Sequence, residues 1–176
     1  LGASVTVHHG ETGLQGTPTE IERHRGVLHV ATTRSLYRLR PDADSGASFE
    51  AFPTVAQVGD EVQCWGLLFE GDQTFVGTTQ GLVQMGPGDR TEYPITSYSV
   101  YDLIRARTDS SRFYAATSRG LRAVRRMAGG WTVAPIRPDF EVEIRHLLQD
   151  SENTLWAASG RGVYRFRGLG AQDSVT

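Results

Sequence analysis

The sequence predicts an all-β fold of the β-propeller type, with about four blades that each contain four antiparallel strands. Three observations support this prediction. Short apolar segments alternate with turns rich in Gly, Asp and Ser along the 176 residues, as in chains of β-hairpins. One motif of about eight residues recurs four times, about forty residues apart, a period typical of propellers. No segment shows a convincing helical period of apolar residues.

The recurring motif is an aromatic residue or His, two or three small residues, a polar turn and then Leu or Val. Its four copies are residues 29–36, 75–82, 114–121 and 156–163. Aligning the copies divides the chain into four similar units. The predicted repeat units are residues 18–53, 62–95, 100–136 and 144–176, and residues 3–9 are predicted to be an extra outer strand. Residues 1–176 are therefore expected to be a single β-propeller region.

The strands are expected in the same order in every unit, separated by polar turns. In the first unit they begin near Thr19, Val27, Leu36 and Ser48. The second unit has apolar segments at residues 62–69, 74–76, 82–85 and 91–95, and the third at 100–106, 113–115, 121–125 and 131–136. The fourth has three clear strands within residues 144–167 and a weak tail at 171–176.

Packing and turn geometry explain most of the residues in the motif. The small pairs, such as Val76-Gly77, are expected where neighbouring blades press together and large side chains do not fit. Gly81, Gly120 and Gly162 are expected to adopt a positive φ in the hairpin turn. Ser35 takes this place in the first copy, so that turn is expected to differ.

The composition excludes several classes of function. The net charge is −2 with 22% charged residues, so nothing favours nucleic acid or an anionic membrane as a partner. All eighteen basic residues are Arg, which excludes Schiff-base and P-loop lysines from this chain. Cys64 is the only cysteine, so no intrachain disulfide forms. No apolar run is long enough to cross a bilayer, so we expect no membrane insertion by this segment.

The fourth unit carries a recognisable pattern. It reads Leu147-x-x-Asp150-x-x-Asn153-x-Leu155-Trp156-x-x-Ser159-x-x-Gly162-Val163-Tyr164-Arg165. This pattern resembles the two-component regulator propeller repeat. The second and third units match it less closely and the first weakly. Three of the four copies also have alanine, at positions 31, 116 and 158, where the family usually has glycine.

The resemblance implies the sensor region of a bacterial signalling protein, in a periplasmic or other extracytoplasmic location. Members of this family in gut bacteria often respond to polysaccharide fragments, so the partner that we expect is a carbohydrate or other anionic small ligand. The family's propellers usually have more blades than the units seen here. The chain begins with Leu1 and shows no signal peptide, so we expect a piece of a longer protein or a processed product. Three arrangements remain open: a slice completed by the remaining blades, closure as four blades, and self-association of two chains into one ring.

The predicted ligand-binding residues lie in loops on one face of the blades. Turns between the second and third strands carry Arg34, Gln80, Arg119 and Arg161, and guanidinium groups there could bind carboxylates or phosphates. The loops that lead into the next blade add Tyr98, Tyr101, Asp139 and Phe140. The alternative is that these turns are polar only because they are exposed to water.

We predict no catalytic residues, no metal site and no cofactor. The five His residues lack metal-binding spacing, and Gly-x-Ser-x-Gly is absent. Residues 150–156 resemble the aspartate box of sialidase-like propellers, which is a structural turn. Asp102, Glu141 and Glu143 could supply a carboxylate pair, but nothing in the sequence makes them converge. The predicted function is therefore non-catalytic sensing. The alternatives are part of a propeller glycoside hydrolase or lyase, and a structural interaction platform.

Overall fold

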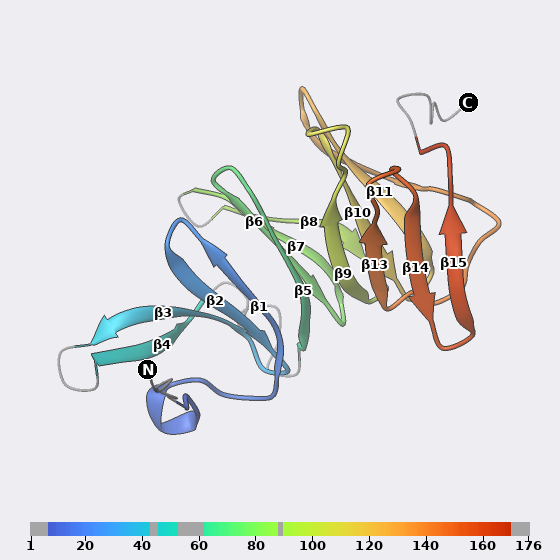
Figure 1. Cartoon of the computed structure of the whole chain (residues 1–176). Coiled ribbons are helices and arrows are strands. Elements are labelled where there is room, and N and C mark those ends of the chain that lie inside the picture. Colours follow the sequence, from blue (N-terminus) through green and yellow to red (C-terminus); the bar gives the residue numbers. More distant parts are fainter. Residues whose placement is uncertain (1–6, 43–45, 53–61, 88–89, 170–176) are drawn as a thin grey trace. The chain divides into compact units, whose positions relative to one another are not determined.

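The computed structural model describes residues 7–42, 46–52, 62–87 and 90–169, and these residues form four antiparallel β-sheets (Figure 1). In every sheet the strands pair in the order in which they follow along the chain. Each sheet is thus a simple meander, as in a propeller blade. The only described helix is a 3-10 turn, η1 (Gly10–Thr12). The predicted all-β fold with blade-like sheets is confirmed.

The first three sheets each have four strands. They are β1 (Pro18–His24), β2 (Val27–Thr32), β3 (Leu36–Asp42) and β4 (Gly46–Ala51); then β5 (Cys64–Glu70), β6 (Gln73–Thr78), β7 (Gly81–Met85) and β8 (Thr91–Thr96); then β9 (Val100–Arg105), β10 (Arg112–Thr117), β11 (Gly120–Met127) and β12 (Gly130–Pro135).

The fourth sheet has three strands, β13 (His146–Gln149), β14 (Leu155–Ser159) and β15 (Gly162–Phe166). The weak tail predicted at residues 171–176 lies outside the described residues. So do residues 3–6 of the predicted outer strand, and residues 7–9 belong to no strand.

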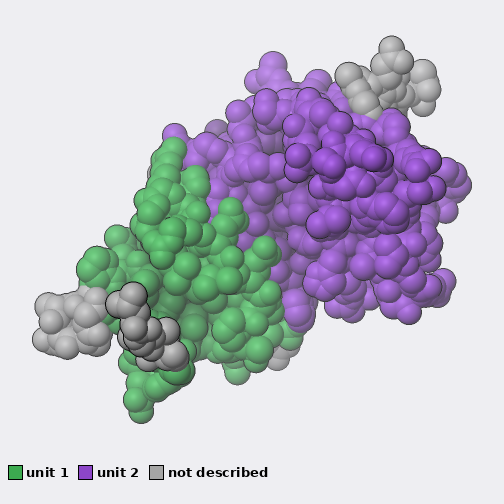
Figure 2. Space-filling model, in the orientation of Figure 1, with its two compact units in different colours: residues 1–64 green, residues 65–176 purple. Residues whose placement is uncertain are grey.

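The chain forms two compact units, residues 1–64 and residues 65–176 (Figure 2). The core of the first unit contains the buried side chains of Leu14, Val30, Tyr37 and Phe49. The second unit contains the other three sheets. The expectation that residues 1–176 form one propeller region stays a prediction.

Opposite charges join β3 and β4, the last two strands of the first sheet. Glu50 on β4 accepts hydrogen bonds from the Nε atoms of two arginines on β3. Arg38, which pairs with Glu50 in the strand register, donates at 2.9 Å, and Arg40 donates at 2.8 Å. These two bonds lower the pKa of Glu50 to about 2. Such cross-strand pairs align the strands, and here they fix the register at an exposed edge.

The sheet that contains β10 is buried on both faces. Phe113 and Ala115 on β10 pack into one cluster with Phe75, whereas Tyr114 and Ala116 pack into another that contains residues of the fourth sheet. Successive side chains of a strand point to opposite faces. The three sheets of the second unit therefore stack face to face, which is how propeller blades pack.

The roles predicted for the small residues and glycines are confirmed where the structure tests them. A Cβ atom on Gly77 would lie 2.8 Å from the carbonyl oxygen of Val100 on the neighbouring sheet. Gly81, Gly120 and Gly162 have φ values of 139°, 82° and 138°, where other residues are strained. Ser35 has no such φ, so the turn of the first copy differs as expected.

Candidate functional site

A repeated hydroxyl closes the turns that carry four of the predicted binding residues. The last residue of the second strand in each sheet is Thr or Ser, and its side-chain oxygen accepts the backbone N–H two residues later. The bonds join Thr32 to Arg34 (3.0 Å), Thr78 to Gln80 (3.1 Å), Thr117 to Arg119 (3.0 Å) and Ser159 to Arg161 (2.9 Å). The repeat therefore holds the backbone of these residues in a defined turn.

The side chains of the four turn residues are exposed. Within the described parts of the chain, none of them makes an ion pair or a side-chain hydrogen bond. Arg34 lies in the first unit, and Gln80, Arg119 and Arg161 lie in the second. Because Arg34 belongs to another unit than Arg119 and Arg161, the structure does not test whether the three guanidinium groups form one rim, and the arginine rim stays a prediction.

One serine joins two of these turns. The hydroxyl of Ser99, in the loop between β8 and β9, donates to the carbonyl of Thr79 at 2.9 Å. The Ser99 carbonyl accepts the N–H of Ser118 at 3.0 Å. The turns that carry Gln80 and Arg119 are therefore linked through the loop that joins their blades, on the same edge of the sheets.

Three of the predicted loop residues have structural contacts. The Tyr98 hydroxyl accepts a hydrogen bond from Arg122 Nε at 3.1 Å, and the Tyr98 ring packs against the core. Phe140 makes edge contacts with two aromatic rings of β15. Asp139 forms an exposed ion pair with Arg137 at 3.0 Å. Packing and local pairing account for all three.

Tyr101 lies in a mixed aromatic and charged group, which we call the Tyr101 cluster and which contains Trp65, Tyr101, Glu143 and Arg145. The Arg145 guanidinium carbon lies 4.0 Å from the centre of the Tyr101 ring. Arg145 Nε donates to Glu143 Oε1 at 2.7 Å, and the Tyr101 hydroxyl lies 3.4 Å from Glu143 Oε2. The Trp65 and Tyr101 ring centres are 6.3 Å apart, edge to face. Sequence reasoning identified Tyr101 but missed Trp65 and Arg145.

The Tyr101 cluster forms because the first strands of three sheets approach one another. Trp65 and Tyr101 are the second residues of β5 and β9, and Arg145 directly precedes β13. A Cβ atom on Gly66 would lie 3.1 Å from Asp102 Cα, so β5 and β9 are nearly in backbone contact. Asp102 Oδ2 accepts the N–H of Leu147 on β13 at 2.7 Å.

The Tyr101 cluster keeps free hydrogen-bonding capacity. Arg145 and Glu143 are each 46% exposed. Among the described residues, Arg145 donates a side-chain hydrogen bond only through Nε, to Glu143, so its terminal guanidinium nitrogens keep their donors. Aromatic surfaces with a few polar groups are typical of sites for small organic ligands, and guanidinium donors favour a carboxylate or phosphate on that ligand.

The carboxylates near the Tyr101 cluster are occupied. Glu143 pairs with Arg145, and Asp102 accepts backbone N–H groups from Leu103 and Leu147, both at 2.7 Å. Burial raises the pKa of Asp102, although these two hydrogen bonds oppose the shift. Asp102 therefore joins β9 to β13.

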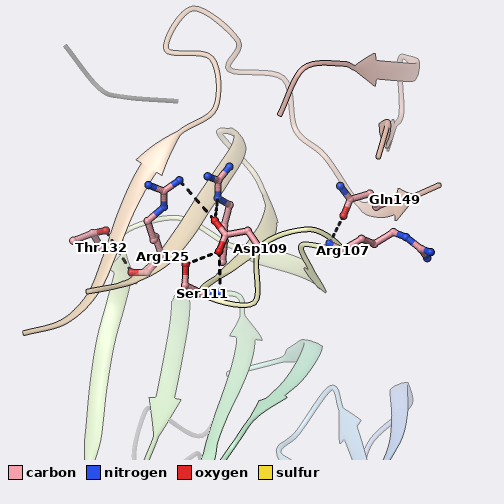
Figure 3. A network of polar contacts seen from close by, with 7 residues as sticks. Arg107, Asp109, Ser111, Arg125, Thr132 and Gln149 are labelled. Carbon is pink, nitrogen blue, oxygen red and sulfur yellow. Dashed lines mark hydrogen bonds and ion pairs between the residues drawn. The ribbon is translucent and has the colours of Figure 1, made fainter. Parts of the chain in front are cut away.

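The turns at the other end of the sheets are structural. Figure 3 shows the third sheet's turn, where Asp109 Oδ1 accepts the N–H and the hydroxyl of Ser111 at 3.0 and 2.6 Å. Asp109 also pairs with the buried Arg112 at 3.3 Å. In the fourth sheet, Asp150 accepts Trp156 Nε1 at 2.8 Å and two backbone N–H groups. The turn that resembles an aspartate box thus holds the hairpin together.

The structure offers few groups for other chemistry. Burial raises the pKa of the Cys64 thiol to about 12, so the thiol is protonated and unreactive at neutral pH. In the described ranges, no three His, Cys, Asp or Glu side chains lie close enough to hold a metal ion. The described residues contain no helix that is both long and apolar enough to span a membrane.

No protein-family model matches the chain, and no curated protein sequence is similar to it. Solved structures are similar in fold. The extracellular domain of the BT4673 hybrid two-component system from B. thetaiotaomicron matches with a TM-score of 0.66 and 20% identity, over 85% of this chain and 21% of that one. The corresponding domain of BT3049 from the same organism has a TM-score of 0.57 and 17% identity, over 80% and 18%.

An enzyme is among the structural neighbours as well. An ancestral GH74 enzyme matches with a TM-score of 0.59 and 15% identity, over 85% of this chain and 22% of that one. The chain therefore spans about a fifth of the length of these neighbours. These two extracellular domains of two-component systems agree with the resemblance carried by the fourth repeat, and the chain has a β-propeller type of fold.

Proposed function

We propose that this chain is part of a non-catalytic sensor propeller of a bacterial two-component-type signalling protein, located outside the cytoplasmic membrane. The proposal rests on the fold, which extracellular domains of hybrid two-component systems share. It also rests on the repeat pattern of the fourth unit. The ligand that we propose is a carbohydrate or another small organic molecule with an anionic group.

The observation that carries the proposal is the Tyr101 cluster. Its aromatic rings offer flat apolar surface, and Arg145 offers charged N–H donors beside them. A sugar ring that bears a carboxylate has both matching features, since its C–H faces are apolar and its anionic group accepts guanidinium hydrogen bonds. Residues from three sheets contribute, so one bound ligand would contact three blades at once.

This arrangement suggests how binding would be transmitted. A ligand on the starting ends of β5, β9 and β13 favours the blade spacing in which all three sets of contacts form. If a second packing of the blades, or of two chains, has a different spacing, the ligand shifts the population toward the first. The shift is limited by the difference in ligand affinity between the two packings.

The enzyme alternative rests on the GH74 neighbour. Glycoside hydrolysis normally needs two carboxyl groups that flank the scissile bond. Near the Tyr101 cluster, Glu143 is paired with Arg145, and Asp102 is bonded to two backbone N–H groups. These contacts favour binding over hydrolysis.

The platform alternative rests on an exposed apolar face. Leu148 on β13 and Val163 on β15 are 62% and 68% exposed, whereas their neighbours Leu147 and Tyr164 point into the core. Both faces of the adjacent β9–β12 sheet are covered by other sheets. We propose that a further blade of the same protein covers this face in the same way.

The test of the Tyr101 cluster is a binding screen of the intact protein against neutral and acidic oligosaccharides, followed by calorimetry of the best ligand. Tyr101→Ala and Arg145→Gln are each expected to weaken binding about tenfold or more, because each removes a ring contact or a charge-assisted hydrogen bond. Tyr93→Ala is the matched control, since Tyr93 is a half-exposed tyrosine on β8 outside the cluster.

A second set of variants separates the Tyr101 cluster from the arginine rim. The triple variant Arg34/Arg119/Arg161→Ala is expected to weaken an anionic ligand only if that ligand also reaches the turns. Loss of affinity in the triple variant together with unchanged affinity in Tyr101→Ala would move the site to the rim. Unchanged affinity in every variant would reject both locations.

A further inference from the structure

The second unit has a cleft at the end of the sheets opposite the Tyr101 cluster. It lies between the turn before β6, the described residues 86, 87 and 90 beside β7 and β8, and the turn between β11 and β12, and its volume is about 520 Å³. The polar and aromatic lining comes from Gln73, Gln84, Arg90, Glu92, Arg126 and Trp131. Sites for small organic molecules have volumes in this range.

The cleft is a separate site. Trp65 lies at the start of β5, and Gln73 follows the turn at the other end of that strand. A strand of seven residues is about 20 Å long at ~3.3 Å per residue. One small ligand cannot span both places.

Arg126 faces the cleft with its hydrogen-bonding capacity largely unused. Its ion-pair partner Glu70 is also in close contact with Arg105, through the other carboxylate oxygen. Arg126 Nη2 lies 3.7 Å from Glu70 Oε1, which is too long for a hydrogen bond. The guanidinium carbon lies 5.0 Å from the centre of the Trp131 ring, and the side chain is 49% exposed. A guanidinium held in this way can donate paired hydrogen bonds to a carboxylate.

Trp131 provides a fixed wall. Its Nε1 donates to Gln73 Oε1 at 2.9 Å. Its ring contacts Phe75 and Phe113, with centres 4.9 and 5.4 Å away. Met127 lies beside the same cleft and is 53% exposed. The wall therefore combines a rigid ring with a flexible apolar side chain, which suits an apolar ligand body.

Gln84 adds an unsatisfied acceptor at the floor. Its side chain is only 6% exposed, yet its Oε1 has no hydrogen-bond partner among the described residues. Buried polar atoms without a partner are rare and call for an explanation. The last torsion of a glutamine side chain is soft, so rotation of the amide can present this oxygen to a donor in the cleft that Gln84 lines.

Arg90 and Glu92 do not compete for the same ligand group. They pair with each other at 2.6 Å and are more exposed than the floor of the cleft. Their charges therefore cancel, and Arg126 provides the remaining positive charge of the lining. An anion is favoured over a cation at this place.

We propose that this cleft binds a small hydroxycarboxylate. Arg126 takes the carboxylate, Gln84 Oε1 accepts a hydrogen bond from the hydroxyl, and the carbon body lies against Trp131 and Met127. The proposal does not depend on the ligand of the Tyr101 cluster, and Tyr101→Ala is expected to leave this binding unchanged.

The test uses three matched probes with the intact protein: mandelate, mandelamide and phenylacetate. Mandelate has the charge, the hydroxyl and an aromatic body, whereas mandelamide lacks the charge and phenylacetate lacks the hydroxyl. Calorimetry is expected to show mandelate binding about tenfold or more tighter than mandelamide, as for a charge-assisted hydrogen bond. Phenylacetate is expected to bind several-fold more weakly than mandelate, since the Gln84 acceptor then stays unpaired.

Variants assign each preference to its residue. Arg126→Gln should abolish the preference for mandelate over mandelamide, and Gln84→Leu should abolish the preference over phenylacetate. Arg165→Gln is the control, because Arg165 also lies over a tryptophan, Trp156 at 5.7 Å, but outside this cleft. Circular dichroism melts check that each variant is folded, and Arg126→Lys retains the charge if Arg126→Gln is unstable. Equal affinities for mandelate and mandelamide, an unchanged preference in Arg126→Gln, loss of the preference in the charge-retaining Arg126→Lys, or no mandelate binding would overturn the proposal.

Discussion

Replacing Gly77 by Ala is expected to destabilise the protein, although the repeat itself suggests the opposite. Ala31, Ala116 and Ala158 occupy the equivalent place in the other three copies. Alanine in a strand is normally more favourable than glycine by about 0.5–1 kcal/mol, because glycine loses more backbone freedom on folding. An alignment of the repeats would therefore recommend Gly77→Ala as a stabilising change.

The structure predicts instead that Gly77→Ala lowers the free energy of unfolding. The added Cβ would lie 2.8 Å from the backbone oxygen of Val100 and 3.0 Å from its Cγ1 atom. A backbone carbonyl cannot move without shifting β9, which packs against β6 at this point. Overpacking of a tight interior costs about 1–3 kcal/mol. After subtraction of the glycine term, we expect a net loss of about 1 kcal/mol in the free energy of unfolding, within a range of about 0–2.5 kcal/mol.

Urea denaturation followed by fluorescence measures this loss. The control is Gly160→Ala, because a Cβ on Gly160 has nothing within 4 Å and its φ is not positive. We expect Gly160→Ala to be neutral or slightly stabilising. If Gly77→Ala is as stable as the control, the second and third sheets are not packed as closely as described, and the face-to-face stacking of blades is refuted.

Two further predictions concern buried charges. Asp109 pairs with Arg112, which is only 3% exposed. Asp109→Ala should therefore lower the free energy of unfolding by about 2 kcal/mol. This is less than the full cost of breaking a buried pair, because Asp109 is partly exposed. Urea melts should show no comparable loss in Asp139→Ala, an exposed pair, and equal effects would contradict the role of Arg112. Burial raises the pKa of Asp102, so its native state favours the protonated form, and its contribution to stability falls as pH rises from about 4 through the raised pKa. The stability of the wild type minus that of Asp102→Asn should therefore decrease between about pH 4 and pH 7, and an increase would show that the pKa is instead lowered.

Much of the fold follows from the sequence because its causes are local. Apolar segments bounded by turn residues define the strands, and Gly81 and Gly120 mark turns that need a positive φ. The repeat then extends each local assignment to the equivalent place in the next unit. The hydroxyls that close the turns, such as Thr78 and Thr117, are also visible in the aligned copies, although their function needs the structure.

The binding places are harder to predict because they depend on contacts between blades. Trp65 and Tyr101 occupy the same place in successive repeats, but their approach depends on how closely β5 and β9 pack. The cleft beside Trp131 depends on how Arg105 and Arg126 share the carboxylate of Glu70, which is in closer contact with Arg105 and forms a long ion pair of 3.7 Å with Arg126. The spacing of these residues along the chain does not reveal that they meet.

The central claim is that the protein binds its ligand without transforming it. The most direct measurement is to incubate the intact protein with the oligosaccharide that binds most tightly and to follow the mass of that oligosaccharide over many times the lifetime of the complex. A sensor leaves the chain length unchanged while calorimetry still reports saturable binding that Tyr101→Ala weakens. Shorter oligosaccharides with new reducing ends would show hydrolysis, and unsaturated products would show a lyase; either result would contradict the account.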